Sequence, residues 1–157
     1  MLNSRAVILL AMAFFTLLSA CSGFKETGEY HPIDAEGWAY GDTVHFNIES
    51  PDSVIRGDIA VVVRHTAAYP YSNIWLEINY PQQDKTVSDS VNIVLADDFG
   101  NWLGRGAGLS FQRVDTVLRD VTLSTPAEVT LRHIMRVDRL SDIEQLGVVF
   151  IPYETHR

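Results

Sequence analysis

The sequence predicts an all-β domain, an antiparallel two-sheet β-sandwich of about eight strands. Apolar and polar residues alternate with a period of two through most of the chain, which is typical of strands with one buried face. Pro, Gly, Asn and Asp separate these runs by roughly 12–15 residues, wider than in small immunoglobulin-like domains. The pattern therefore favours a sandwich with long loops, and a jelly roll is one arrangement that fits it.

The individual strands follow from this alternation. It is clearest at residues 44–48, 74–80 and 87–95, where Asp89 is the one polar residue on an otherwise apolar face. Residues 59–63 form a largely β-branched run, which suits a strand buried on both sides. Further strands are expected at 109–114, 129–131 and 146–150.

Helical signals are few. Ser141-Asp142-Ile143-Glu144 resembles a capping box, the pattern that begins many helices. Gly147 and a predicted strand follow at once, so we expect at most one helical turn here.

Residues 1–20 predict a signal peptide with lipid attachment at Cys21. Residues 6–18 are almost wholly apolar, but thirteen residues are too few to cross a ~30 Å hydrocarbon core as a helix. Leu18-Ser19-Ala20-Cys21 resembles the bacterial lipobox, which implies cleavage before Cys21 and acylation of its thiol and new amino terminus with chains such as palmitate. Several chains on one residue anchor stably. A secreted protein and an uncleaved anchor helix are the alternatives.

The residues after Cys21 bear on location and domain organisation. Ser22 rather than Asp follows the cysteine, which by resemblance to enterobacterial sorting favours the outer membrane. Acidic residues are sparse up to Glu29, which favours the periplasmic face. Residues 21–30 are polar and contain glycine, so we expect a lipidated tether followed by one domain over 31–157.

Charge and cysteine content exclude several classes of protein. The net charge is −8, so nucleic acid and a basic membrane-binding face are not expected. Cys21 is the only cysteine, so the chain has no internal disulfide.

The first candidate binding segment is Tyr69-Pro70-Tyr71-Ser72-Asn73-Ile74-Trp75-Leu76. Its rings could form a platform for a glycan or peptide, because Tyr and Trp combine large contact area with a polar tip. The structural interpretation, which we favour, is a hairpin corner with Pro70 in the turn and the rings packed over the open end of the sandwich. The candidate contact residues are Tyr69, Tyr71, Asn73 and Trp75.

The second segment is the glycine-rich stretch 95–108. Its Gly104-Arg105-Gly106-Ala107-Gly108 spacing superficially resembles a phosphate loop, but a strand rather than a helix is predicted to follow. Asp97, Asp98 and Asn101 lack the ligand spacing of a known calcium loop. We expect a hairpin with residues 99–101 at its tip and glycines at bulges or close approaches. Trp102 and Arg105 are the candidate contact residues.

Catalytic, metal and cofactor sites are not expected. The five histidines are scattered, and the serines lack a nucleophile-elbow context. Arg136, near the end of a predicted strand, is either solvated or pins a partner's carboxylate. Arg136 is therefore the last of the candidate partner-binding residues, with Tyr69, Tyr71, Asn73, Trp75, Trp102 and Arg105.

Four segments spread over residues 18–150 together resemble a known protein family in their order and spacing. They are the lipobox, the stretch from Arg64-His65 to Trp75-Leu76, the Leu-Ala-Asp…Gly-Asn-Trp-Leu-Gly-Arg-Gly block, and the ending Met135-Arg136…Leu140…Leu146-Gly147. Together they resemble GldH, the gliding motility lipoprotein family of Bacteroidota. The resemblance implies an outer-membrane lipoprotein of the gliding and type IX secretion machinery, and it implies no catalytic residues.

Three functions remain open on the sequence. The favoured one is a non-enzymatic lipoprotein that contacts other envelope proteins. A glycan-binding module is the alternative, and it requires exposed, coplanar aromatic rings beside polar groups. A hydrolase would require two convergent titratable side chains in a cleft.

Overall fold

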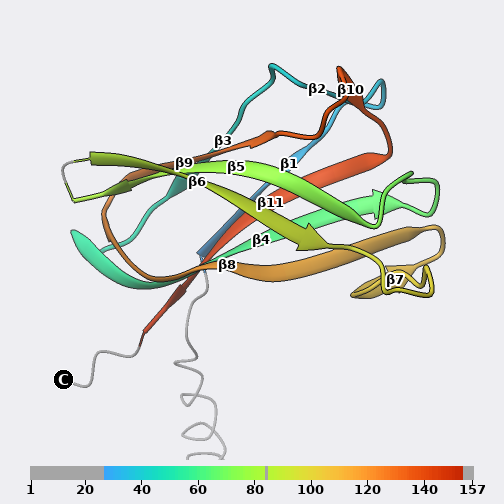
Figure 1. The fold of residues 1–157 in the computed structure, drawn as a ribbon. Helices are drawn as coiled ribbons and strands as arrows, with labels where there is room; N and C mark the ends of the chain where they lie inside the picture. Colours follow the sequence, from blue (N-terminus) through green and yellow to red (C-terminus); the bar gives the residue numbers. More distant parts are fainter. Residues whose placement is uncertain (1–26, 84, 154–157) are drawn as a thin grey trace, which may run out of the picture.

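The computed structural model describes residues 27–83 and 85–153, and it confirms the all-β, antiparallel sandwich (Figure 1). The described chain contains no helix, and therefore none that could span a membrane. The strands are β1 (Thr27–Pro32), β2 (Trp38–Ala39), β3 (Val44–Ile48), β4 (Val54–Thr66), β5 (Asn73–Gln82), β6 (Lys85–Val94), β7 (Arg105–Ala107), β8 (Ser110–Ser124), β9 (Ala127–His133), β10 (Arg139–Leu140) and β11 (Ile143–Pro152).

The strand order is that of a jelly roll. One sheet has the order β1-β11-β4-β8-β7 and the other β3-β9-β5-β6, while β10 and β2 pair separately. With the short strands β2, β7 and β10 set aside, eight long strands remain, four in each main sheet. Two intertwined Greek keys of this kind bury one face of every strand.

The central strand β4 is buried on both faces, as the run at 59–63 predicts. Ile59, Val61 and Val63 lie in the main core between the sheets. Ala60 and Val62 form a small second cluster with Val149 on the other face of the sheet. There the ring of Tyr30 lies against Gly147, where an added Cβ would be 2.5 Å from the ring.

Asp89, the polar exception in β6, faces inward and has a partner. The Tyr80 hydroxyl donates a hydrogen bond to its carboxylate at 3.0 Å. Burial, and then this carboxylate, raise the pKa of Tyr80 to about 12. The pair satisfies a polar group that the apolar face would otherwise leave without a partner.

Two segments bear on the expectations from sequence. Strand β1 begins at Thr27, so residues 27–30 belong to the sandwich; Cys21, the signal peptide and residues 21–26 lie outside the described residues. Residues 141–144 form no helical turn, because Asp142 has φ of +64° and β11 begins at Ile143. The Asp142 carboxylate instead accepts the Thr66 hydroxyl at 2.8 Å, and its carbonyl accepts the Thr66 amide at 3.0 Å.

The sandwich has two distinct ends. At the proximal end, β1 begins at Thr27 and β11 ends at Pro152 (Figure 1). At the distal end lie the loops 67–72, 95–104 and 134–142 and the turn at 108–109, because the antiparallel register reverses direction at each strand.

Candidate functional site

The Tyr69–Leu76 segment forms the predicted corner at the distal end. Tyr69 is 3% exposed, and its hydroxyl donates to the Asn73 carbonyl at 3.1 Å. Burial raises the pKa of Tyr69 well above its usual value. Tyr71 packs edge-on against Tyr69, with ring centroids 5.7 Å apart, and stays 36% exposed. Tyr69 therefore packs inside the corner and offers no contact surface. Tyr71 is exposed enough to contact a partner.

The stretch 95–104 forms the predicted hairpin, held by one carboxylate. Asp97 accepts the amides of Phe99 at 2.9 Å and Asn101 at 2.8 Å, and the Asn101 side chain at 2.9 Å. These hydrogen bonds, the Asn101 side chain first, hold the pKa of Asp97 below its usual range. Within residues 27–83 and 85–153, no group of three His, Cys, Asp or Glu could hold a metal ion.

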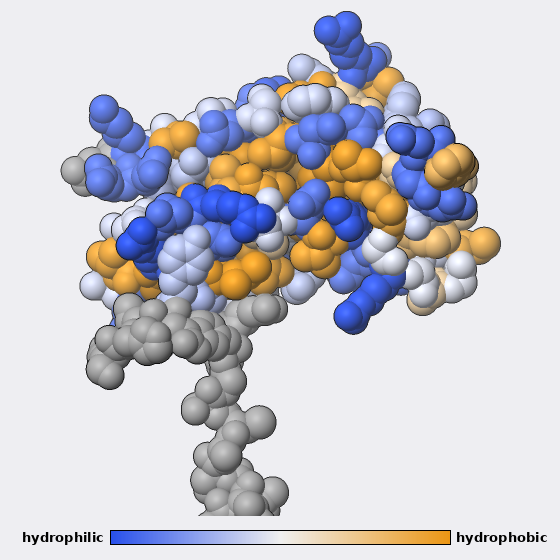
Figure 2. All heavy atoms as spheres, turned by 60° about the horizontal axis from the view of Figure 1, so that its bottom comes forward, coloured by the Kyte–Doolittle hydropathy of each residue, from blue (hydrophilic) through white to orange (hydrophobic). Residues whose placement is uncertain are grey.

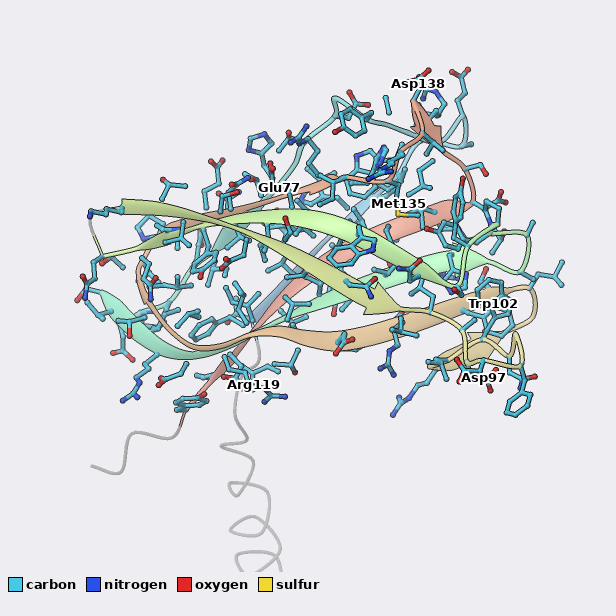
Figure 3. The ribbon with its side chains drawn as sticks, in the orientation of Figure 1. Glu77, Asp97, Trp102, Arg119, Met135 and Asp138 are labelled. Atoms are coloured by element: carbon cyan, nitrogen blue, oxygen red, sulfur yellow. The ribbon has the colours of Figure 1, made fainter. Side chains whose placement is uncertain are left out.

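The 69–76 corner and the 95–104 hairpin both pack on one aromatic cluster, made by His65, Tyr69, Trp102 and Phe111. Trp102 packs edge-on to His65 with centroids 4.6 Å apart, and it also contacts Phe111 at 6.0 Å and Tyr69 at 6.5 Å. Asp97 and Trp102 lie together beside β7 in Figure 3, at the end away from Arg119. Trp102 is half-buried, so its main contacts are with the domain itself.

Two apolar side chains project from these hairpins into solvent. Phe99 is 90% exposed at the tip of the 95–104 hairpin, and Leu109 is 77% exposed in the turn between β7 and β8. The Ala67 amide donates to the Leu109 carbonyl at 2.7 Å, which ties this turn to the β4–β5 corner. Exposed apolar groups on braced turns are typical of contact surfaces.

Arg105 adds a positive charge at the same end. It faces Gln112 across the β7–β8 pair, and Gln112 faces Arg64, so the three share the outer face of the sheet. Arg64 pairs with Glu144 at 3.0 Å. No ion pair involves Arg105 within the described part of the chain. We call the surface made by Tyr71, Phe99, Arg105 and Leu109 the distal tip.

The remaining predicted residues lie on a separate surface, the outer face of the four-stranded sheet. Trp75 is 42% exposed there, and its amide contacts the Met135 sulfur at 3.3 Å, which places the loop carrying exposed Arg136 beside it. Asn73 donates to the Asn92 side chain at 2.7 Å rather than to nearby backbone. The structure thus divides the predicted contact residues between two surfaces.

Sequence reasoning missed Phe99 and Leu109 as contact residues. It placed Phe99 at a hairpin tip, but an apolar residue in a strand-rich sequence is normally assigned to the core. It also missed the proximal network, in which Arg56 binds Asp120 while Asp58 accepts the Asp120 amide at 2.9 Å. These partners lie more than 60 residues apart, so no local pattern reveals them.

Two hollows on the described surface bear on hydrolase activity. One is lined by Arg64, Arg105, Gly106, Ala107, Ser110, Phe111 and Gln112, and the other by Glu49, Ser50, Pro51, Ser53, Thr125 and Pro126. Neither brings together two carboxylates, which hydrolysis of a glycoside would require.

Similarity to solved structures is weak. The chain aligns with an exo-beta-1,3-galactanase from Phanerochaete chrysosporium at a TM-score of 0.39 and 12% identity, covering 80% of this chain and 27% of that one. It aligns with Eiger TNF from S. frugiperda at 0.35 and 8%, covering 84% and 97%. Scores this low carry no argument about function.

Sequence relatives are more informative. The gliding motility lipoprotein GldH homolog of Christiangramia forsetii is 33% identical over 94 residues, 59% of this chain and 56% of that protein's length. The chain therefore matches little more than half of this relative. The model of the GldH lipoprotein family matches residues 25–150, which includes both main sheets and the distal tip. The chain thus belongs to the GldH lipoprotein family.

Proposed function

We propose that this chain is a lipid-anchored accessory protein of the gliding motility and type IX secretion machinery, and that it acts by binding another envelope protein at the distal tip. Membership of the GldH lipoprotein family supports a membrane-anchored place in the cell envelope. We place it at the periplasmic face of the outer membrane, anchored through Cys21. Its role is non-enzymatic, with no cofactor.

The observation that carries the proposal is the pair of exposed apolar side chains at the distal tip. Phe99 and Leu109 extend from turns whose backbone is held by hydrogen bonds to Asp97 and Ala67, so the turns are formed before a partner binds. Such preorganisation reduces the entropy lost on binding. Exposed Arg105 beside them suits a carboxylate on the partner.

The position of the tip also supports the proposal. With lipid on Cys21, residues 21–26 would form a tether of at most about 20 Å when extended. This tether leads into the proximal end, so the distal tip would face away from the anchoring membrane and be accessible to proteins in the envelope.

Complementation of a deletion strain tests the proposal. We expect deletion to abolish spreading and type IX secretion, and Cys21→Ala to weaken both. Phe99→Ser with Leu109→Ser should also fail to restore them, while the protein accumulates to its normal level. Val54→Ser, which changes a 58% exposed residue at the proximal end, is the matched control and should restore both. Normal spreading and secretion in the deletion strain, or in the tip double variant, would contradict the proposal.

A glycan-binding role is the second candidate, and Trp75 is the observation that favours it. Its exposed ring lies beside the Asn73–Asn92 amide pair, a suitable setting for stacking on a sugar. Trp102 is held in the distal aromatic cluster and does not form a second coplanar ring with Trp75. Binding of envelope polysaccharide that Trp75→Ala abolishes would favour this role over protein binding.

A further inference from the structure

The sandwich is closed along one side. Strand β1 lies against β3 there: the Asn47 amide donates to the Glu29 carboxylate, and the rings of His31 and Phe46 pack edge-on with centroids 5.1 Å apart. These contacts join an edge strand of one sheet to an edge strand of the other.

The opposite side, between β6 and β8, is open. Strand β6 pairs with β5 on one side only, and β7 covers β8 only as far as Gln112. No side-chain hydrogen bond or ion pair joins β6 to β8 in the residues that the structure describes. Both strands therefore present free backbone edges on the same side of the sandwich, and we call this unpaired boundary between β6 and β8 the opening (Figure 1).

Strand β6 has few of the features that normally protect an edge, and its one inward charge, Asp89, is paired with the Tyr80 hydroxyl. It is ten residues long, and its register with β5 runs without a bulge. Its one Lys is the first residue, Lys85, and it has no Pro. The side chains on its outer face are all uncharged: Thr86, Ser88, Ser90, Asn92 and Val94. A long, regular edge of this kind is a template for another strand.

Strand β8 is protected by comparison. Its register with β4 shifts twice around Ile59, and such bulges twist an edge away from partners. Arg113 and Asp115 also face inward on it, opposite Val63 and Val61. Two inward charges and the bulges disfavour addition of a strand at β8 more than the single, paired Asp89 does at β6, so β6 is the more available edge.

The opening beside β6 has a surface that specifies the added strand. Val87 and Val91 of β6 and Val117 and Leu118 of β8 pack on the core there and remain partly exposed. Figure 2 shows apolar surface gathered along the middle of the face it presents, between hydrophilic margins. A strand beside β6 would place every second side chain over these residues, so those side chains should be apolar.

Charge favours a basic segment from another protein over a second copy of this chain. Asp89 and Asp115 both line the opening, and Arg113, 3.9 Å from Asp115, balances only one of them. Two copies of a chain with net charge −8 would also repel each other.

We propose that the β6 edge receives an extended, basic segment of another envelope protein by strand addition. The segment has apolar side chains at alternate positions and a Lys or Arg facing Asp89. This surface is separate from the distal tip, and neither proposal depends on the other.

A synthetic peptide tests the proposal with the full lipidated chain in detergent. The probe is about twelve residues long: Thr occupies every second position, and Val occupies the positions between except for one central Lys, which shares the face of the Val residues and can therefore face Asp89. We expect it to bind, and we expect backbone N-methylation at alternate residues to weaken binding at least about tenfold, because methylation removes the strand hydrogen bonds. A peptide with Glu in place of this Lys should also bind more weakly. The difference in affinity between the two peptides should be smaller at high salt, because salt screens the charges.

Two protein variants locate the binding edge. Val91→Lys places a charge in the opening and should weaken binding at least about tenfold. Val44→Lys makes the same change on β3, the opposite and covered edge of the same sheet, and should leave binding within about twofold. If Val91→Lys lowers the melting temperature so far that the protein unfolds, the N-methylated peptide alone decides.

Three results would overturn the proposal. The first is no binding of the Lys–Val peptide at about millimolar concentration. The second is binding that neither N-methylation nor Val91→Lys weakens. The third is a dimer of the chain that dissociates on Val91→Lys, which would make a second copy the occupant.

Discussion

At the scale of single residues, two histidines are buried where the fold disfavours their protonation. His65 and His133 have no exposed surface, and each leaves one ring nitrogen buried without a partner. His65 donates from Nδ1 to the Thr66 carbonyl at 2.9 Å, which assigns the proton of its neutral form. Burial is the main cause that lowers the pKa of both rings below the usual value.

This lowered pKa predicts a loss of stability in mild acid. Below about pH 6.5 the histidines are protonated in the unfolded chain but remain neutral in the folded protein. The free energy of unfolding therefore falls as the pH drops towards the folded pKa of these histidines. His65→Phe keeps an aromatic ring and removes one titrating group, so its stability should fall less steeply between about pH 7.5 and 5.5. Chemical denaturation across this range measures the slope.

The control for this prediction is Val54→Ser, which changes an exposed residue that does not titrate. It should keep the slope of the unmodified protein. Equal slopes for His65→Phe and the unmodified protein would show that His65 does not contribute to the pH dependence.

At the scale of elements, the distal hairpins depend on Gly104. It has φ of +93°, and an added Cβ would lie 2.2 Å from the Gln112 carbonyl oxygen. Gly104→Ala should therefore lower the free energy of unfolding by about 1–3 kcal/mol, since backbone must move and the dihedral is strained. Gly41→Ala, at a position with no atom within 4 Å, should change it by less than about 0.5 kcal/mol. Equal effects of the two changes in urea denaturation would contradict this account.

The sequence predicts most strands because one face of each is apolar. In β5 the alternating burial of Ile74, Leu76 and Ile78 follows the sequence directly. Strand β1 was missed because its inward residues, Thr27, Glu29 and His31, are polar and lie at the edge of the sandwich. The capping-box pattern at 141–144 begins no helix, in line with the expectation of at most one turn, and the partner of Asp142 is Thr66, 76 residues away.

The candidate site was predictable only in part. Local turn chemistry placed the 95–104 hairpin correctly, since Asp97, Gly100 and Asn101 form a turn within a few residues. It could not separate buried Tyr69 from half-exposed Tyr71, because their difference arises from Trp102 and His65 on other elements. Which aromatic rings remain accessible is decided by tertiary packing.

At the scale of the whole molecule, the jelly roll places Thr27 and the distal tip at opposite ends, so the proposed anchor and the proposed binding surface would be separated by the length of the domain. The same antiparallel register that brings Thr27 next to Phe150 sends the turns at 98–101 and 108–109 to the opposite end. A short tether and a rigid domain would together hold the distal tip at a defined height above the membrane. This arrangement suits an accessory protein that positions a partner.

Site-specific cross-linking in living cells tests partner binding at the distal tip most directly. A photoreactive amino acid replaces Phe99 in one strain and Val54, at the proximal end, in another. We expect one discrete cross-linked species from position 99, lost when Leu109→Ser is added, and none of that size from position 54. No adduct from position 99, or the same adduct in equal yield from both positions, would contradict the assignment of the distal tip as the partner-binding surface.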